Sequence, residues 1–288
     1  MTAVACVGGG HGLAATLRAV SPWAQELTAI VSVADDGGSS GRLRDQLGML
    51  PPGDLRRCLG ALADPTSVLG AALEHRFDAG DLKGHPLGNL LLAGLVDQGL
   101  DVEAALAEVG RLIGARGRVL PAATVPVTLC GERGPGLSVE GQVRVQSSSD
   151  VHRVAVTPAD PPTPAAVGRA LRDADVVVLG PGSLFTSVLA AAVVPGVAAT
   201  LSATEATRVL VINIGTQVGE AEGLGPDDHL RLALDHHLPV DVVLADPRFA
   251  PETAPEGVDL VVVPVGADGR AVHDPGRLGA ALRDLPRR

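Results

Sequence analysis

Six short apolar runs constrain the fold more than any other feature of this sequence. Each run has Val, Ile, Leu or Ala at successive positions, as in strands that helices cover on both faces. The runs are 3–7, 28–33, 175–179, 209–214, 240–245 and 260–265. Helical patterns at 163–172, 226–237 and 275–285 alternate with the later runs. This alternation predicts an α/β fold, with a doubly wound, mainly parallel sheet in a Rossmann-like core.

The middle of the chain follows a different pattern. Residues 53–114 contain several helical segments, including a Leu-rich one at 87–100 and one at 102–113 with apolar spacings of three and four. From 125 to 156 the pattern changes to strand-like alternation through Val139, Val143 and Val145. We therefore predict one α/β domain over 1–288 with a helical and β-rich insertion at approximately 53–156. Its Leu-rich helices at 87–113 predict a homodimer.

Composition excludes several classes of protein. The 288 residues are 46% hydrophobic and 19% charged, which excludes a disordered chain. One Trp, three Phe and no Tyr leave too few rings to stack on a string of bases. A net charge of −10 further argues against nucleic acid or an anionic membrane as a partner. A small phosphorylated ligand held by backbone amides remains compatible with this charge.

Localisation and redox state follow from what the sequence lacks. Residues 1–10 carry no signal-peptide pattern, and the longest apolar stretch, 188–201, is broken by Pro195 and Gly196, so no membrane span is expected. The three cysteines have no metal-binding spacing and are expected to be reduced, buried thiols. A cytoplasmic protein is predicted.

The first candidate binding loop is GGGHGL, residues 8–13, between the first strand and a helix. Its glycines, Gly8, Gly9, Gly10 and Gly12, let the backbone approach an anion, which the N–H groups of the helix N-terminus can bind, and His11 lies among them as a further candidate. The loop lacks the third glycine of a dinucleotide fingerprint and the lysine of a P-loop. A tight turn without a ligand is the alternative interpretation.

The second candidate loop is ADDGGSSGRLR, residues 34–44, after the second strand. In dinucleotide-type folds an acidic residue here accepts hydrogen bonds from a ribose, a role open to Asp35 or Asp36, which are also candidates to hold a divalent cation. The polar residues that follow add hydrogen-bond donors; they are Gly37, Gly38, Ser39 and Ser40. A solvated loop, with Arg42 or Arg44 paired to an aspartate, is the alternative.

The third candidate loop is GPGSLFTS, residues 180–187, between a buried strand and an Ala/Val-rich helix. Gly180 and Gly182 free the backbone, and Ser183 and Thr186 can cap the helix or donate to a ligand. Capping alone explains Ser183 but not the two glycines around Pro181.

Further polar candidates lie outside these three loops. Asp54 is predicted to cap the helix that follows 51–53, and Arg56 and Arg57 in its first turns suggest an anion nearby, because cations are unfavourable at a helix start. Asn89 is a cap or a ligand contact, in a segment that also offers Lys83 and His85. The histidines 229, 236 and 237 lack a third ligand at readable spacing, so no metal site is predicted.

These loops resemble the gluconeogenesis-factor family, also called YvcK-like, in the superfamily of CofD-like 2-phospho-lactate transferases. The matching stretches are 8–13, 34–59, 83–95, 117–130 and 178–187. The resemblance implies a Rossmann-like three-layer α/β/α fold with an inserted helical part. It also implies a cytoplasmic protein that binds a nucleotide sugar, UDP-N-acetylglucosamine, and is needed for cell shape and wall synthesis on gluconeogenic carbon sources. No settled catalytic activity comes with the family.

Most of the candidate residues match the family's loops. The residues carried over are Gly8, Gly9, Gly10, Gly12, Asp35, Asp36, Gly37, Gly38, Ser39, Ser40, Asn89, Gly180, Gly182, Ser183 and Thr186. Two positions in these stretches differ, because His11 stands where the family usually has Thr, and Arg57 stands where it usually has Asn. The stretch after Ser187 also lacks the family's usual Pro-Asn pair.

Three functional hypotheses remain open. The first is a nucleotide-sugar-binding regulator, which the long match at 34–59 favours. The second is a transferase of the 2-phospho-lactate transferase type, in which Asp35 and Asp36 would hold Mg²⁺ and a pyrophosphate. The third is a dinucleotide-dependent enzyme, against which the incomplete glycine fingerprint stands.

Overall fold

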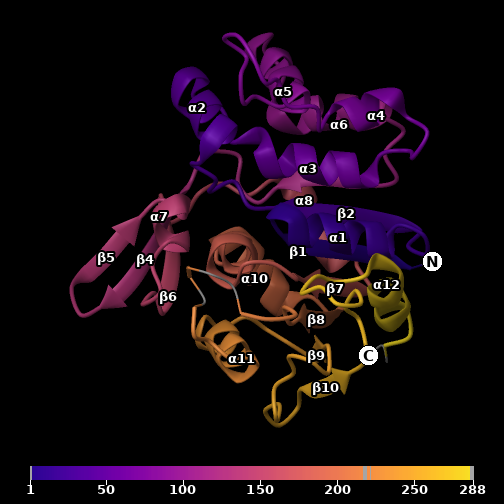
Figure 1. Cartoon of the computed structure of the whole chain (residues 1–288), viewed down its shortest axis with the longest axis vertical. Helices are drawn as coiled ribbons and strands as arrows, with labels where there is room; N and C mark the ends of the chain where they lie inside the picture. The colour runs from indigo at the N-terminus through magenta and orange to yellow at the C-terminus, as the bar shows by residue number, and fades with distance from the viewer. Residues whose placement is uncertain (1, 217–218, 221, 286–288) are drawn as a thin grey trace.

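A parallel sheet of seven strands forms the centre of the protein. The computed structural model describes residues 2–216, 219–220 and 222–285. The strand order is β10-β9-β8-β7-β1-β2-β3, and every neighbouring pair is parallel (Figure 1). The strands are β1 Ala3–Gly8, β2 Glu26–Val31, β3 Arg118–Pro121, β7 Val176–Leu179, β8 Thr207–Val211, β9 Val242–Ala245 and β10 Asp259–Val262. The predicted α/β fold with a parallel sheet is therefore confirmed.

The chain winds in both directions from the middle of this sheet. From β1 it moves to β2 and β3 on one side, and from β7 it moves to β8, β9 and β10 on the other. The order therefore reverses between the neighbours β1 and β7, which makes their carboxyl ends the topological switch point. All four residues of β7 are buried, as the unbroken apolar run predicts.

Helices cover both faces because right-handed crossovers in opposite directions place their helices on opposite sides. On one face α1 (Gly10–Val20) packs against α3 (Pro52–Leu62) and α12 (Pro275–Arg283). On the other face lie α8 (Ala165–Arg172), α9 (Ala190–Ala192), α10 (Pro195–Ala203) and α11 (Pro226–Asp235). The α1–α12 packing is close: a Cβ on Gly279 would lie 2.3 Å from the carbonyl oxygen of Ala19. The three-layer arrangement is thus confirmed.

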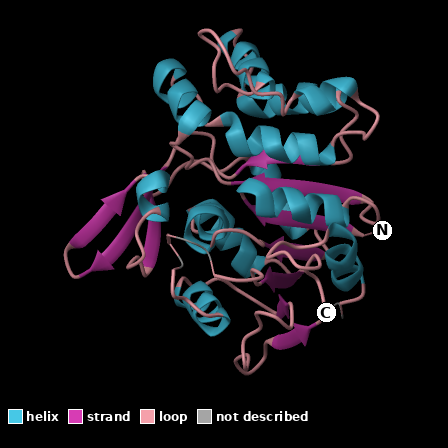
Figure 2. Cartoon of the chain, viewed as in Figure 1, coloured by secondary structure: helices cyan, strands magenta, loops and turns pink. Residues whose placement is uncertain are grey.

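The predicted insertion at approximately 53–156 covers three structurally different parts. The first is helical, α3 to α6, and packs beyond α1 together with α2 (Figure 1). The second is β3, which pairs with β2 at the edge of the main sheet and was not among the six predicted strands. The third is a separate antiparallel sheet of order β5-β4-β6 (Figure 2). The remaining elements are α2 Gly38–Leu47, α4 Val68–Ala72, α5 Leu87–Asp97, α6 Val102–Leu112, β4 Thr128–Gly134, β5 Leu137–Glu140, α7 Gln142–Gln146 and β6 Arg153–Thr157.

The predicted strand alternation through Val143 and Val145 was wrong, because both residues lie in the short helix α7. Gly141 has a φ of +100°, a conformation that turns the chain out of β5 and that other residues rarely adopt. The Oδ1 atom of Asp36 then accepts a hydrogen bond of 3.0 Å from the N–H of Val143 at the start of the helix. Alternating valines therefore do not distinguish this helix from a strand.

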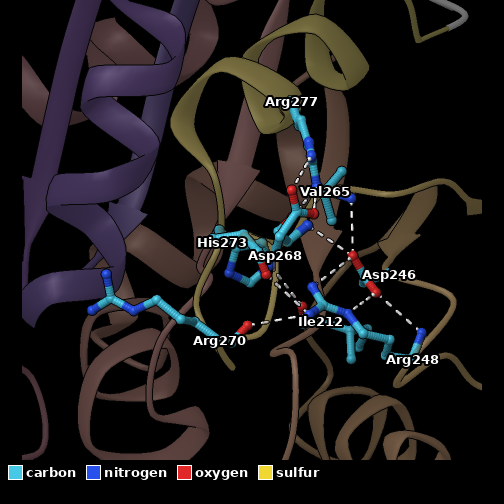
Figure 3. A network of polar contacts seen from close by, with 10 residues as sticks. Ile212, Asp246, Arg248, Val265, Asp268, Arg270, His273 and Arg277 are labelled. Atoms are coloured by element: carbon cyan, nitrogen blue, oxygen red, sulfur yellow. Dashed lines mark hydrogen bonds and ion pairs between the residues drawn. The ribbon is translucent and has the colours of Figure 1, made fainter.

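A polar network centred on Asp246, directly after β9, connects the segment after β10 to the sheet (Figure 3). The buried Asp246 carboxylate pairs with Arg248, with Oδ1 2.7 Å from Nε, and accepts the N–H groups of Val265 and Gly266. A Cβ on Gly266 would lie 1.5 Å from the Arg248 guanidinium, so this approach needs glycine. The network joins the β9 end to the segment after β10.

Within residues 2–216, 219–220 and 222–285, no single helix is long and apolar enough to cross a membrane. One pair, Leu184–Ala192 and Pro195–Ala203, bent by 75°, meets the length and composition criteria together.

Candidate functional site

A cavity of about 350 Å³ lies at the carboxyl ends of β1 and β7, where ligands bind in open α/β sheets. We call it the switch-point cavity. Its lining residues come from the first and third glycine loops, the second loop, α3, α7 and the helical segment η1 (Leu184–Leu189). They are Gly9, Gly10, His11, Gly12, Asp35, Asp54, Arg57, Gln142, Gln146, Gly182, Ser183, Thr186 and Ser187. Half of the predicted site residues therefore meet in one place.

The first and third loops touch each other at Gly12. A Cβ at this position would lie 2.1 Å from the carbonyl oxygen of Pro181, a contact that no side chain permits. The hydroxyl of Thr16, one turn further along α1, donates to the carbonyl of Gly180 at 2.9 Å. Gly12 thus has a packing role that brings the N-terminus of α1 beside the third loop.

Asn213, after β8, holds the third loop in place. Its Nδ2 donates to the carbonyl of Gly182 at 2.8 Å, and its Oδ1 accepts the N–H of Gly182 at 3.0 Å. Ser183 stands at the N-cap position of η1 but makes no side-chain capping bond there. The predicted capping role of Ser183 is therefore not observed. The side chain of Asn213 positions the loop instead.

Asp54 connects α3 to the first glycine loop. Its Oδ2 accepts the N–H of Gly10 at 2.8 Å, and its Oδ1 accepts a hydrogen bond of 2.5 Å from Arg57. The prediction that Asp54 caps its helix was wrong: the N-cap is Pro51, and Asp54 lies inside the first turn, pointing at α1. A Cβ on Gly9 would lie 2.7 Å from Asp54 Oδ2, so the glycine makes room for this carboxylate.

The adjacent aspartates of the second loop have different environments. Asp35 lines the cavity and accepts the N–H of Gly37 through Oδ1 at 2.9 Å. Asp36 points to the small sheet, where it binds the N–H of Val143 at the start of α7. Asp36 therefore positions α7, and α7 brings Gln142 and Gln146 to the cavity wall.

Ser39 and Asn89 do not line the cavity and form a buried cluster with His85. The Ser39 hydroxyl is 2.8 Å from Nδ1 of His85 and accepts a hydrogen bond of 3.0 Å from Nδ2 of Asn89. This cluster ties the start of α2 to α5. The neighbouring Ser40 faces α3, since a Cβ on Gly53 would lie 2.2 Å from its hydroxyl. The predicted residues that do not line the cavity are Gly8, Asp36, Gly37, Gly38, Ser39, Ser40, Asn89 and Gly180.

Charges of both signs meet in the cavity. Burial and the nearby negative charge of Asp35 raise the pKa of Asp54, while Arg57 lowers it. The Arg57 cation, followed by burial, lowers the pKa of His11. Burial raises the pKa of Glu220, which lies behind Thr186, to about 7. Within the described residues, no group of three or more His, Cys, Asp and Glu side chains could hold a metal ion.

Several cavity residues carried no local sequence signal. Gln142 and Gln146 lie more than 100 residues from Gly9, and contacts with distant segments, such as the bond from Val143 to Asp36, bring their helix there. Asp54 and Arg57 are conspicuous as charges at the start of a helix, but nothing in the sequence places them beside Gly10. An apolar cavity of about 450 Å³ between β6, α10 and the end of α11 contains none of the predicted residues.

The fold and the cavity define an α/β protein with a ligand site at the switch point of its sheet, lined by glycine loops and helix N-termini. The model of the 2-phospho-L-lactate transferase CofD family matches residues 4–273 of the chain. The chain therefore belongs to the CofD-like family, in the branch of the gluconeogenesis factors.

Individual relatives support this assignment. The gluconeogenesis factor of Bacillus subtilis strain 168 is 38% identical over 255 residues, which cover 86% of this chain and 80% of that protein. A Mycobacterium tuberculosis H37Rv protein, provisionally named a gluconeogenesis factor, is 42% identical over 304 residues, covering 97% and 89%. The crystal structure of a Bacillus halodurans protein of the UPF0052 family superposes with a TM-score of 0.91 at 35% identity, covering 98% and 99%.

Proposed function

We propose that this protein binds a nucleotide sugar of the UDP-N-acetylglucosamine type in the switch-point cavity and regulates envelope synthesis and cell shape during gluconeogenic growth. The observation that supports this most is that α1 and η1 begin at one cavity, which also presents Arg57 and Asp35. N-terminal N–H groups and a guanidinium bind diphosphates, and a carboxylate accepts hydrogen bonds from hydroxyls. The names of the relatives as gluconeogenesis factors support the regulatory part.

Each part of the ligand has a group of matching chemistry in the cavity. The diphosphate would lie at the backbone of residues 10–12 and at Arg57, with the N–H of Thr186 on the other side. Asp35 would accept from a ribose or sugar hydroxyl. Gln142 and Gln146 offer amide groups on the α7 wall. Because nucleotide sugars are made in the cytoplasm, this ligand also implies a cytoplasmic protein.

A direct test is to identify the small molecules that copurify with the protein. After gentle purification and denaturation, mass spectrometry of the released material should find a UDP-sugar in near-stoichiometric amount. The matched control is Arg57→Ala, which removes the one lining guanidinium and should release less of the same molecule. Copurified NAD or a phosphorylated acid in its place would contradict the proposal.

A Mg²⁺-dependent transferase is the second candidate, because the description of the matching family names this activity. In its favour, the charge of Asp35 acts on Asp54 inside one cavity, and paired carboxylates are common ligands of Mg²⁺. Against it, Gly10 and Arg57 already bind both oxygens of Asp54. We expect calorimetry to give affinities for UDP-N-acetylglucosamine that agree within about twofold in EDTA and in Mg²⁺. A clear strengthening by Mg²⁺ would favour the transferase.

We also propose that the protein forms a homodimer through its Leu-rich helical layer. In α5 the side chains of Leu87, Leu90, Leu91 and Leu95 are only half-buried, and Leu47 at the end of α2 is 48% exposed. Covering such apolar surface would favour association. Light scattering should give twice the monomer mass of 29.1 kDa, and a species of 29.1 kDa at micromolar protein would contradict the proposal.

A further inference from the structure

Glu220 is a buried carboxyl group that none of the three glycine loops contains. Its side chain is 1% exposed, and its Oε2 accepts the backbone N–H of Thr186 at 3.0 Å. Its Oε1 is buried and makes no hydrogen bond within the described part of the chain, although the hydroxyls of Thr186 and Ser183 lie close enough to lower its pKa. Thr186 and Ser183 both line the switch-point cavity, so Glu220 lies directly behind that wall.

The residue before Glu220 is pressed against the opposite wall. Gly219 has a φ of +93°, and a Cβ there would lie 2.1 Å from the carbonyl oxygen of Gln146 in α7. Gln146 also lines the cavity. The backbone at 219–220 thus runs between α7 and η1, and this contact holds the Glu220 carboxyl against the start of η1.

The backbone N–H of Thr186, which Glu220 accepts, is a donor of the kind that binds phosphate oxygens. A backbone N–H at the start of a helical segment stabilises an anion there, and a carboxylate and a phosphate oxygen are equivalent acceptors for it. Asp54 occupies the N–H of Gly10 in the same manner at the start of α1, but Arg57 compensates its charge. Glu220 has no such cation among the main influences on its pKa, which are burial and uncharged hydrogen-bond donors.

We propose that Glu220 is an internal competitor for the anionic part of the ligand: a phosphate takes the N–H of Thr186 only when the Glu220 carboxyl is neutral, so binding brings one proton with it. The inference rests on the proposed function for the identity of the ligand, but not for the competition itself. An ionised Glu220 would both occupy the N–H and repel a phosphate across a short distance inside the cavity.

Other charged groups around Glu220 do not replace it in this role. None of them is among the largest influences on its pKa, which leaves burial as the main reason that this pKa is raised to about 7. The titratable and charged side chains on the surrounding elements are Arg144 on α7, then Asp227, Asp228, His229, Arg231 and Asp235 on α11, and His11, Asp35, Asp54 and Arg57 at the cavity. The Arg57 cation and burial lower the pKa of His11. A pH dependence of binding that came from His11 would persist in a variant without Glu220, so such a variant distinguishes the two groups.

The test follows the backbone amide resonance of Thr186 by NMR at pH 6 and pH 8.5. The proteins are the wild type, Glu220→Gln and the matched control Glu222→Gln, whose side chain is exposed. The probes are sodium sulfate and UDP-N-acetylglucosamine, because neither anion changes its charge between these pH values. In the wild type, both probes should shift the Thr186 amide at pH 6 and bind about 30-fold more weakly at pH 8.5, where the neutral fraction of Glu220 is small.

Glu220→Gln should bind both probes equally at the two pH values, with the pH 6 affinity of the wild type, and Glu222→Gln should behave as the wild type. Persistence of the pH dependence in Glu220→Gln, or failure of both probes to move the Thr186 amide in that variant, would overturn the proposal. If Glu220→Gln fails to fold, calorimetry on the wild type decides: uptake of nearly one proton per sulfate or UDP-sugar bound at pH 8.5 supports the proposal, and no uptake overturns it.

The outcomes separate this inference from the proposed function. A Thr186 response to sulfate that depends on Glu220, with none to UDP-N-acetylglucosamine, would support the competition and reject the nucleotide sugar. Binding of the UDP-sugar at the cavity with no pH dependence would support the ligand and reject the competition.

Discussion

The carboxylate of Asp54 accepts a hydrogen bond from the backbone N–H of Gly10, with 2.8 Å between Oδ2 and the nitrogen, across 44 residues of sequence. This contact joins α3 to the first glycine loop and places Arg57 at the cavity. It explains why the loop needs a glycine at position 9, where any side chain would meet the carboxylate.

Replacing Asp54 should therefore cost stability as well as ligand affinity. In Asp54→Ala the Gly10 N–H and the Arg57 guanidinium lose a buried partner, which we expect to lower the free energy of unfolding by about 1–3 kcal/mol. Urea unfolding measures this difference. Asp45→Ala, on the exposed side of α2, is the control and should change the free energy by less than about 0.5 kcal/mol. Equal effects of the two substitutions would contradict the account of Asp54.

The two adjacent aspartates offer a matched pair of variants. Asp35→Asn removes the charge of the acceptor that lines the cavity and should weaken binding of UDP-N-acetylglucosamine about tenfold or more. Asp36→Asn keeps an oxygen for the N–H of Val143 and should change the affinity by no more than about twofold. Calorimetry on both variants distinguishes them. A larger loss from Asp36→Asn would move the ligand toward α7.

Gly12 is expected to be intolerant of even one methyl group. A Cβ there would lie 2.1 Å from the Pro181 carbonyl, so Gly12→Ala must separate the first and third loops and should reduce both stability and ligand affinity. Gly94→Ala is the control, because its Cβ would meet nothing within 4 Å in α5, and a helix gains up to about 1 kcal/mol from this change. Thermal unfolding of both variants should give shifts of opposite sign, and shifts of the same sign would count against the close contact.

The Asp246 network predicts an acid-dependent part of the stability. The Arg248 guanidinium, together with the N–H groups of Arg248, Gly266 and Val265, holds the pKa of Asp246 well below its usual value. A carboxyl group with a lowered folded-state pKa stabilises the fold above its unfolded pKa of about 3.9, and this stabilisation is lost as the pH falls below that value.

Asp246→Asn should therefore be less stable than the wild type by about 1–3 kcal/mol at pH 7, with a difference that shrinks between about pH 4 and pH 2. Urea unfolding at a series of pH values measures it. Asp259→Asn, an exposed carboxylate at the start of β10, is the control. A difference that grows on acidification would contradict the assignment.

The sequence predicted those elements whose signal is local. The unbroken apolar runs of β1 and β7 identify strands buried on both faces, and the glycine loops at their ends indicate the switch point. The strand β3 was missed because only two apolar residues stand between Arg118 and Pro121, and a proline is tolerated at this place only because β3 is an edge strand. In α7 the turn at Gly141 and the bond from Asp36 decide the structure, and alternating valines do not reveal either.

The cavity was predictable only where the chain itself forms a loop at a strand end. Gly9, Gly10, Gly12, Gly182 and Thr186 follow from that rule. The partners of Asp54, Asn213 and Glu220 depend on contacts between distant segments, and a single sequence does not indicate such pairings. The same limit explains why Asp35 and Asp36 looked equivalent, although only one of them lines the cavity.

The measurement that tests the central claim most directly is the melting temperature of the wild-type protein with and without UDP-N-acetylglucosamine. Ligand at about 100 times its dissociation constant adds about 2.7 kcal/mol of stability. In a domain of this size that corresponds to a shift on the order of 5–10 °C. We predict a shift of this size with the UDP-sugar and a much smaller one with NAD or a phosphorylated acid. No shift with UDP-sugars, together with a large shift for NAD or a phosphorylated acid, would contradict the proposed function.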